Sequence, residues 1–203
     1  MDSYFDKFSY GINISETKTA NLDGFKRWLS NLSTLIMSEP EKHRFFDFLV
    51  DNGYFEKPAS ISHHGKDYGD LFAHSYNVAQ TLIYYTTELG LKWLRPESPM
   101  IVGLFHDLCK VDNYISDGRV SGNCRESSFC YNDKQLMQGH GDKSVILLSQ
   151  FMTLTLEEIL CIRYHMGAYE KDARDGFDLS IRTYPNVLYT HTADMYASKF
   201  MNT

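Results

Sequence analysis

The spacing of apolar residues predicts a chain made almost entirely of helices. Between residues 22 and 37, apolar side chains recur every three or four positions, which places them on one face of a helix. These side chains are Leu22, Phe25, Trp28, Leu29, Leu32 and Leu35. Ser38 then precedes a second helix, which has Pro40 in its first turn and a stop near Gly53.

The polar segment EKPASISHHGKDYG, residues 56–69, separates these two helices from a further series. We predict the further helices over residues 70–89, 96–111, 142–151, 155–167 and 185–201. Asp70 and Asp142 are candidate N-caps, and Thr155 with Glu158 has the spacing of a capping box. Gly90 follows the predicted helix over residues 70–89 and is expected to end it.

Residues 112–139 look irregular and carry the only strand signals, which are short and weak. Within them, SDGR is compatible with a hairpin turn between Tyr114-Ile115 and Val120. Because the rest of the pattern is helical, the expected fold class is all-α.

The composition fits a globular protein of one domain, or of one domain with a small helical extension. The chain has 203 residues, of which 43% are hydrophobic and 14% aromatic, enough for a core of this size. Its net charge is −6 and its isoelectric point is about 5.7. Since an acidic chain repels long polyanions, we expect no long duplex nucleic acid as a partner, and a small substrate or a buried site is favoured.

The four cysteines form no Cys-x-x-Cys pair, so neither a zinc ribbon nor a redox motif is indicated. A disulfide between Cys124 and Cys130 is one interpretation, but free thiols in a reducing compartment are favoured. The N-terminal sequence MDSYFDKF lacks the basic and apolar regions of a secretory signal. No stretch approaches the roughly 18 apolar residues of a membrane span, so we expect a soluble, cytoplasmic protein.

Several of the eight histidines, and some aspartates, fall on or beside apolar helix faces. They include His74, His106, Asp107, His165 and Asp194. A lone buried histidine is usually a satisfied core residue, but an unpaired buried carboxylate costs several kcal/mol. A divalent cation shared by these groups would compensate the charge and accept imidazole lone pairs. A donor set of nitrogen and oxygen without thiolate suits Mn, Fe, Ni, Co, Zn or Mg.

The order of these residues resembles that of the HD-domain superfamily of metal-dependent phosphohydrolases. The matching segments are DLFAHSYNVAQTL, GLFHDLCKV, GHGDKSVILLS, CIRYHMG and THTADMYAS. They carry the series H…HD…H…H…D as His74, His106, Asp107, His140, His165 and Asp194. The resemblance covers residues 63–200, about two-thirds of the chain. The two additional histidines resemble the branch of the superfamily that holds two metals.

The resemblance also implies roles for these residues. One metal site would be made by His74, His106, Asp107 and Asp194. Asp107 would bridge to a second ion held by His140 and His165. Two ions about 3.5–4 Å apart share a water and lower its pKa, which gives a metal-bound hydroxide that attacks phosphorus in line. Lys110, one turn after Asp107, occupies a position that is often basic in this family, and it would stabilise charge that develops on the phosphoryl group.

The segment ISHHGKDYGDLFAHS is similar to the entry of HD domains in bacterial exoribonucleases, where a His-His pair and a Gly-rich turn precede the first ligand. This chain has DYGD where those domains have a Gly-Gly pair. It also lacks the Gly-Tyr-Pro signature of cyclic-dinucleotide phosphodiesterases of this fold. These departures leave the substrate open.

Further polar and aromatic residues are candidates for substrate contact. The polar candidates are His63, His64, Lys66 and Lys143. Aromatic side chains that could stack a base are Tyr68, Phe72, Tyr114, Phe129, Tyr131, Tyr164 and Tyr169. His43 and His191 are interpreted as structural.

We therefore expect an HD-type helical bundle over residues 59–203, with 1–58 as an N-terminal helical segment packed on it and 112–139 as a flap near the site. The expected activity is hydrolysis of a phosphoester in a nucleotide, cyclic nucleotide or short oligonucleotide. One alternative is a hydrolase of (deoxy)nucleoside mono- or triphosphates with one metal, which leaves His140 and His165 without a ligand role. The other is a non-catalytic HD domain that binds a nucleotide, although the complete ligand set argues against it.

Overall fold

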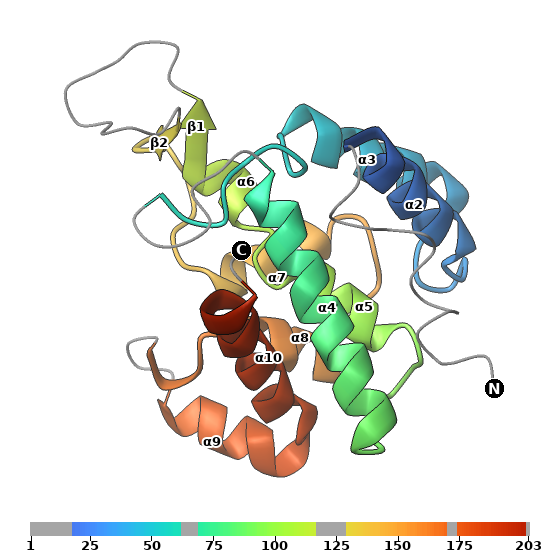
Figure 1. Cartoon of the computed structure of the whole chain (residues 1–203), viewed down its shortest axis with the longest axis vertical. Coiled ribbons are helices and arrows are strands. Elements are labelled where there is room, and N and C mark those ends of the chain that lie inside the picture. Colours follow the sequence, from blue (N-terminus) through green and yellow to red (C-terminus); the bar gives the residue numbers. More distant parts are fainter. Residues whose placement is uncertain (1–17, 62–68, 117–128, 170–173, 202–203) are drawn as a thin grey trace.

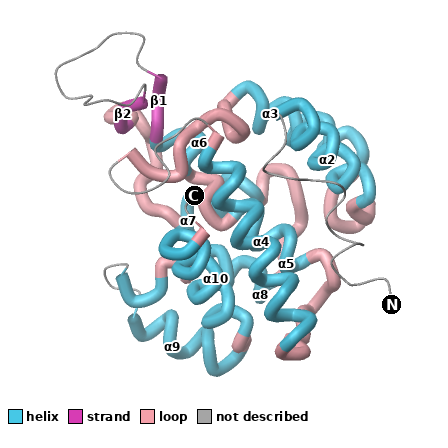
Figure 2. Tube along the Cα trace, viewed as in Figure 1, coloured by secondary structure: helices cyan, strands magenta, loops and turns pink. Residues whose placement is uncertain are grey.

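Helices form most of the structure, as the apolar spacing predicts. The computed structural model describes residues 18–61, 69–116, 129–169 and 174–201 (Figure 1, Figure 2). In chain order the α-helices are α2 (Lys18–Asn31), α3 (Glu39–Asp51), α4 (Asp70–Glu88), α5 (Ser98–Phe105), α6 (Lys110–Asn113), α7 (Gly141–Leu148), α8 (Leu156–Arg163), α9 (Arg174–Thr183) and α10 (Asn186–Phe200). A 3-10 turn, η1 (Gly167–Tyr169), follows α8, and the two short strands are β1 (Tyr114–Ser116) and β2 (Phe129–Tyr131). The all-α fold class is confirmed.

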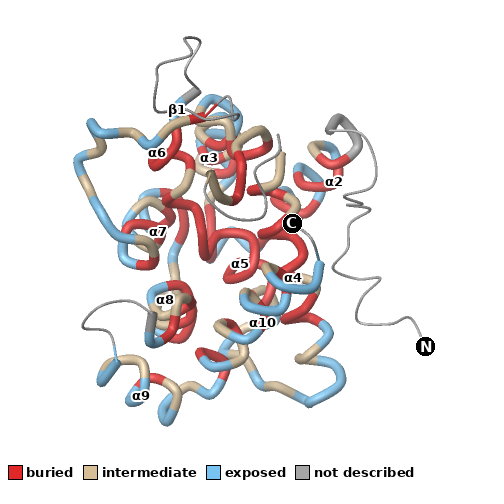
Figure 3. Tube along the Cα trace, turned by 60° about the vertical axis from the view of Figure 1, so that its left-hand side comes forward, coloured by how far each residue is buried: buried red, intermediate tan, exposed pale blue. Residues whose placement is uncertain are grey.

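The centre of the molecule is formed by α4 and α5. The sequence of α5 is SPMIVGLF, and all eight of its residues are buried, because the helix has no polar face to present to solvent. α4 packs against α5 and α10, and α8 contacts both α5 and α10 (Figure 1). The buried positions follow these helices through the molecule, whereas α9 lies at its exposed edge (Figure 3). No helix in the described part of the chain combines the length and the apolar character that a membrane crossing requires.

Two glycines permit the close contacts that position these helices. A Cβ atom at Gly103 would lie 2.3 Å from the Cα atom of Ala79, so α5 crosses α4 with its backbone in direct contact. A Cβ atom at Gly141 would lie 2.1 Å from the carbonyl oxygen of Arg163. The first turn of α7 therefore rests directly against the C-terminal end of α8.

The N-terminal helices join the same core through aromatic rings. The ring centroid of Phe25 on α2 lies 6.3 Å from that of Phe105 on α5 and 6.2 Å from that of Phe72 on α4. Phe45 on α3 contacts Phe105 at 5.1 Å. These ring contacts pack α2 and α3 against the rest of the molecule. Residues 1–17 of the expected N-terminal segment lie outside the described residues.

Several predicted helix boundaries are wrong. The helices predicted over 142–151 and 155–167 end earlier, at Leu148 and Arg163. The first helix ends at Asn31, so Leu35 is exposed and Ile36 is buried in its place. The predicted helix over 96–111 is broken after Phe105, and only a short α6 follows the break. The residues of the HD pair lie in this break, where the backbone continues in tighter turns: Leu108 N–H donates to the carbonyl oxygen of Phe105 (3.1 Å) and Lys110 N–H to that of Asp107 (3.0 Å).

The predicted N-caps of two helices also need correction. Asp70 and Asp142 lie inside the first turns of α4 and α7, where a carboxylate still interacts favourably with the helix dipole. The N-cap of α4 is Gly69, whose φ of 90° is unfavourable for a side-chain-bearing residue. The N-cap of α7 is His140.

The predicted capping box of α8 is confirmed. The backbone N–H of Glu158 donates to Thr155 Oγ1 (3.2 Å), and the Glu158 carboxylate accepts the Thr155 backbone N–H (2.8 Å). The same buried carboxylate accepts hydrogen bonds from Arg95 and Ser98. It thereby holds the start of α5 against the start of α8. Helix α9 was not predicted.

The hairpin differs from the predicted one. β1 pairs with β2 in antiparallel register, with Tyr114 opposite Tyr131 and Ile115 opposite Cys130. The predicted pairing of Tyr114-Ile115 with Val120 is therefore wrong, and Val120 itself lies outside the described residues.

The cysteines follow the predicted free-thiol state only in part. Cys109 and Cys161 are free and buried, as expected. Cys130 on β2 is disulfide-bonded, so the preference for free thiols is wrong at this position. Cys124, the other residue of the disulfide that the sequence left open, lies outside the described residues.

Replacing Gly103 with Ala should destabilise the protein, although alanine in a helix is normally favoured over glycine by about 1 kcal/mol. The added methyl group would meet the backbone of Ala79 and push α5 away from α4. Overpacking of this kind costs about 1–3 kcal/mol. Urea unfolding followed by circular dichroism measures the change. An unchanged or higher stability would show that the two backbones are not in direct contact.

Candidate metal centre

The six side chains that the resemblance singles out meet at one place in the structure. They come from α4, the turn after α5, the N-terminus of α7, the turn after α8, and α10. These residues, called here the His/Asp cluster, are His74, His106, Asp107, His140, His165 and Asp194.

Asp107 lies at the centre of the His/Asp cluster. Its Oδ2 is 3.4 Å from His106 Nε2 and 3.9 Å from His74 Nε2. Its Oδ1 is 3.5 Å from His165 Nε2 and 3.9 Å from His140 Nδ1. The two oxygens of one carboxylate therefore face two different pairs of imidazoles.

Asp194 supplies a second carboxylate on one side of the cluster. Its Oδ1 is 3.1 Å from His74 Nε2 and 3.8 Å from His106 Nε2. Because both of these histidines also face Oδ2 of Asp107, four side chains surround one position. The other two histidines face Oδ1 of Asp107, which is the division into two ligand sets that the resemblance implies.

Backbone carbonyls fix the orientation of two rings. His106 Nδ1 donates to the carbonyl oxygen of Gly103 (2.8 Å), and His165 Nδ1 donates to that of Ile162 (2.7 Å). A proton held on Nδ1 leaves Nε2 with its lone pair exposed to the cluster. His191, interpreted as structural from the sequence, hydrogen-bonds through Nδ1 to the carbonyl oxygen of His165 (2.7 Å) and so braces this turn.

Several atoms of the cluster are buried without a hydrogen-bond partner among the described residues. They are Nδ1 of His74, Nε2 of His106, Nε2 of His165 and Oδ1 of Asp107. Leaving a buried acceptor unpaired costs about 1–3 kcal/mol, and more when the group is charged. Lone pairs that converge on one carboxylate are the donor set that a divalent cation takes, so the residues present fit a metal ion.

Burial and charge act in opposite directions on these ionisable groups. Burial raises the pKa of Asp107, but the ammonium of Lys110 and the imidazole of His106 outweigh it and hold that pKa well below its usual value. Burial also raises the pKa of Asp194, yet the hydrogen bond from His74 and the charge of His106 lower it overall. Burial lowers the pKa of His74, which favours the neutral ring that a metal ligand requires. The hydrogen bond to Asp107 raises the pKa of His140. Burial alone would lower the pKa of His106, but the charge of Asp107 and the hydrogen bond to it raise that pKa overall, so a cation would have to displace protons from these two rings.

Lys110 reaches the cluster directly. Its Nζ is 2.6 Å from Oδ2 of Asp107, one helical turn earlier in the chain. Burial alone would lower the pKa of Lys110, but the charge of Asp107 and the hydrogen bond to it raise that pKa above its usual value. Lys110 is therefore an ammonium held against the carboxylate that both ligand sets share.

Lys143 does not fit its predicted contact with substrate. Its fully buried Nζ donates to Asn113 Oδ1 and Gln135 Oε1, both at 2.8 Å, and lies 2.7 Å from Asp112 Oδ2. Three oxygen atoms thus engage the ammonium, which ties the end of α6 to α7. This is a structural role beside the cluster.

The other polar candidates are placed as follows. His63, His64 and Lys66 lie outside the described residues. His43 is exposed on α3, where its Nδ1 contacts the backbone oxygen of Glu39 at 2.9 Å, in agreement with a structural interpretation.

Most of the aromatic residues suggested for base stacking are engaged in the fold. Phe72 belongs to the core, where it packs on Phe25 and Phe55. The rings of Tyr114 and Tyr131 face one another across the hairpin, with centroids 5.5 Å apart. Phe129 is buried, and Tyr164 packs against Phe177. The side chains of Tyr68 and Tyr169 lie outside the described residues.

The sequence interpretation missed Cys109. This buried residue follows Asp107 by two positions, and its Sγ lies 3.8 Å from His140 Nδ1. The signal was present in the segment GLFHDLCKV, where a residue type that ligates metals stands beside the HD pair. Cys109, Asp107 and His140 form one of three groups of potential ligands in the described structure, and all three groups belong to this centre.

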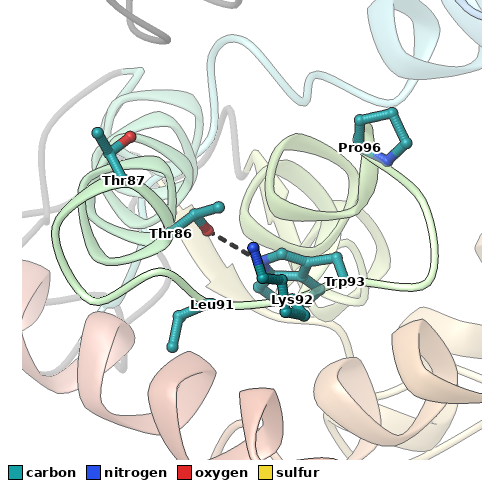
Figure 4. A pocket seen from close by; sticks show the side chains of 6 residues that line it. All are labelled: Thr86, Thr87, Leu91, Lys92, Trp93 and Pro96. Carbon is teal, nitrogen blue, oxygen red and sulfur yellow. Dashed lines mark hydrogen bonds between the residues drawn. The ribbon is translucent and has the colours of Figure 1, made fainter.

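A hollow elsewhere on the surface contains none of these residues. It lies beyond the C-terminal end of α4, where Trp93 Nε1 donates to Thr86 Oγ1 at 2.8 Å (Figure 4). Its lining residues are Thr86, Thr87, Leu91, Lys92, Trp93 and Pro96. This hollow therefore adds no residue to the His/Asp cluster.

Comparison of the chain with protein-family models, with curated proteins and with solved structures finds no match. The assignment of the centre thus rests on its own geometry.

The purified protein should carry close to two divalent ions per chain when it has not been stripped of metal. The two oxygens of Asp107 face separate sets of imidazoles, so each set has its own carboxylate oxygen. Elemental analysis combined with anomalous diffraction measures the number and the positions of the ions. A single well-occupied ion that contacts neither His140 nor His165 would contradict the two-ion arrangement.

Asp107→Ala should remove most of the bound metal from both positions. The substitution deletes the one carboxylate shared by both ligand sets and leaves the imidazoles without charge compensation. The matched control is His43→Ala, because His43 is exposed on α3 and outside the cluster. Metal content per chain, measured on both variants after equal dialysis, checks the result. Equal losses in the two variants would show that the cluster is not the metal centre.

Proposed function

We propose that this protein is a metal-dependent phosphohydrolase of the HD type with two divalent cations. The observation that carries the proposal is the position of Asp107, whose two carboxylate oxygens face separate sets of imidazoles. Paired cations held by shared ligands are the common apparatus of phosphatases, nucleases and related enzymes. The order H…HD…H…H…D along the chain supports the same assignment.

The ligands divide between the two cations. The first set is His74, His106, Asp107 and Asp194, and the second is Asp107, His140 and His165. Bound divalent cations supply Lewis acidity and generate a nucleophile from water near neutral pH. The protein contributes orientation, because the backbone carbonyls of Gly103 and Ile162 hold two of the rings in place before substrate arrives.

Substrate would reach the centre from the side of His140. The side chain of His140 is 43% exposed, whereas those of His106 and His165 are fully buried. Lys110 and Asp194 are the next most accessible groups of the centre. A phosphoryl group that enters there meets the ammonium of Lys110 close to the shared carboxylate.

Lys110 would act on the charge of the phosphoryl group. Its ammonium is fixed 2.6 Å from Asp107 and is held in the charged form by that carboxylate. A positioned cation of this kind stabilises oxygens that gain negative charge as the phosphoester bond breaks. The residue is therefore a candidate catalytic group and not a metal ligand.

The proposed substrate is a phosphoester of a nucleotide, cyclic nucleotide or short oligonucleotide. The resemblance to HD phosphohydrolases supports this class, and the net charge of −6 disfavours long polyanions. The competing proposal is a hydrolase of (deoxy)nucleoside mono- or triphosphates with one metal. In that proposal His140 and His165 bind no metal, although both side chains face Asp107 Oδ1.

The experiment that tests the function is a hydrolysis screen with purified full-length protein. Apo-protein is reloaded separately with Mn, Fe, Co, Ni, Zn and Mg and assayed on mononucleotides, cyclic nucleotides, cyclic dinucleotides and short oligonucleotides. Asp107→Ala serves as the inactive reference and His43→Ala as the active one. Metal-dependent release of phosphate or nucleotide by the native protein alone supports the proposal. Binding of nucleotides without turnover under every metal would instead favour a non-catalytic domain.

Lys110→Met should lower kcat by about 10²-fold or more, as the loss of one electrostatic donor does in other enzymes. The methionine keeps most of the apolar stem and removes the charge. Metal content should stay normal or rise, because the ammonium that contacts Asp107 Oδ2 is gone. Lys134→Met, at an exposed position, is the matched control and should leave both properties unchanged. An unaltered kcat in Lys110→Met would remove this residue from the mechanism.

A further inference from the structure

We propose that Cys109 is a sulfur ligand of the metal centre and shares an ion with Asp107 and His140. The inference rests on the proposed two-cation function, since it adds a ligand to the second of the two sets. It replaces a donor set of nitrogen and oxygen with one that contains a thiolate.

The three donor atoms already lie at near-ligand separations. Cys109 Sγ is 3.8 Å from His140 Nδ1, which is 3.9 Å from Asp107 Oδ1. All three atoms are within 4.8 Å of one another. Two ligands on one tetrahedral zinc ion are about 3.5 Å apart, given bonds of about 2.3 Å to sulfur and about 2.0–2.1 Å to nitrogen. Small side-chain movements would close the group around a cation.

Observations independent of the cysteine also indicate a ligand at this place. Oδ1 of Asp107 is buried, has no hydrogen-bond partner among the described residues, and faces His140. His140 approaches the carboxylate with Nδ1, whereas His74, His106 and His165 approach with Nε2. The Nδ1 edge of the His140 ring is the edge that also faces Cys109.

Cys109 differs from the other buried free cysteine of the described structure. Cys161 belongs to the apolar core cluster, but Cys109 does not, although both are 0% exposed. The backbone N–H of Cys109 donates to Ser144 Oγ at 3.0 Å, which holds the start of α6 against α7. The chain therefore positions this buried sulfur beside His140. Cys161 is the natural matched control.

A sulfur ligand changes which cations the second position prefers. Metal binding releases the thiol proton to solvent, and an electron pair of the sulfur then forms the bond to the cation. Thiolate is a soft ligand that favours zinc, iron and cobalt, whereas magnesium and manganese prefer oxygen ligands. The second position should select against magnesium, and the first, built from imidazole and carboxylate, should be less selective.

Cobalt(II) absorption spectroscopy tests the proposal on the full-length protein. Apo-protein is titrated with cobalt, and the near-ultraviolet region is monitored for a sulfur-to-cobalt charge-transfer band alongside the visible d–d bands. We expect the band in the native protein and in Cys161→Ala, and its loss in Cys109→Ser. The serine variant should also bind its second zinc equivalent about 100-fold more weakly or worse, since loss of even an outer-shell partner costs about 10–100-fold. Its affinity for manganese should change little.

The outcomes separate this proposal from the proposed function. Visible cobalt bands for two ions without a charge-transfer band in the native protein would overturn the sulfur ligand and leave the two-cation function intact. A band that persists in Cys109→Ser and disappears in Cys161→Ala would also overturn it. Binding of manganese or magnesium without cobalt or zinc would overturn the sulfur ligand alone, and failure of the native protein to bind any of these divalent cations would overturn both proposals together.

A second measurement keeps the test decisive if Cys109→Ser does not fold. X-ray absorption at the zinc edge on native protein with two zinc ions needs no variant. We expect a sulfur scatterer at about 2.3 Å, averaging half a sulfur per zinc, in addition to the nitrogen and oxygen shell at about 2.0–2.2 Å. A spectrum explained by nitrogen and oxygen alone would overturn the proposal.

Discussion

A carboxylate buried among helices needs positive charge around it, and in this protein that carboxylate is Asp107. It is nearly inaccessible to solvent, and every other group of the centre is arranged with respect to it. Four imidazoles face its two oxygens and the ammonium of Lys110 contacts one of them. An uncompensated buried charge costs several kcal/mol or more. The imidazoles and the ammonium around Asp107 are therefore needed for the stability of the fold as well as for the proposed chemistry. The same requirement explains why a divalent cation suits the centre, because it satisfies the carboxylates and the unpaired nitrogens at once.

Close backbone contacts set the geometry of the centre. Gly103 lets α5 touch α4, which brings His106 to His74, with their ring centroids 5.3 Å apart. Gly141 lets the first turn of α7 touch the end of α8, which fixes His140 relative to the turn after α8. Ligands that lie far apart in the sequence are thus positioned by helix packing, and such packing deforms little. A preorganised arrangement of this kind retains its shape when the charge at its centre changes.

The apolar pattern predicted the helical class and placed five of the polar residues, His74, His106, Asp107, His165 and Asp194, on or beside apolar helix faces. Only the resemblance to the HD-domain superfamily joined them with His140 into one set. The apolar pattern did not predict α9, whose sequence RDGFDLSIRT is mostly polar and has a glycine in its interior. The break after Phe105 was also missed, because an apolar run gives no sign of where a helix stops. Lys143 was a candidate for substrate contact, yet it is bound by Asn113 and Gln135, which come from segments with no clear local pattern. Partners of this type are set by tertiary packing alone.

The ammonium of Lys110 links the charge balance of the fold to the proposed reaction. It lies against Oδ2 of Asp107, the oxygen that also faces the first set of imidazoles. While that oxygen has no metal, the ammonium supplies the nearest positive charge. A cation bound to the same oxygen would supply more charge at a similar distance, and the two positive groups would repel one another. The lysine side chain, which is 13% exposed, would then move off this oxygen, and the cation would compensate the carboxylate in its place. The ammonium that compensates Asp107 in the fold is thus also the charged side chain that a phosphoryl group would meet beside the shared carboxylate in the proposed reaction.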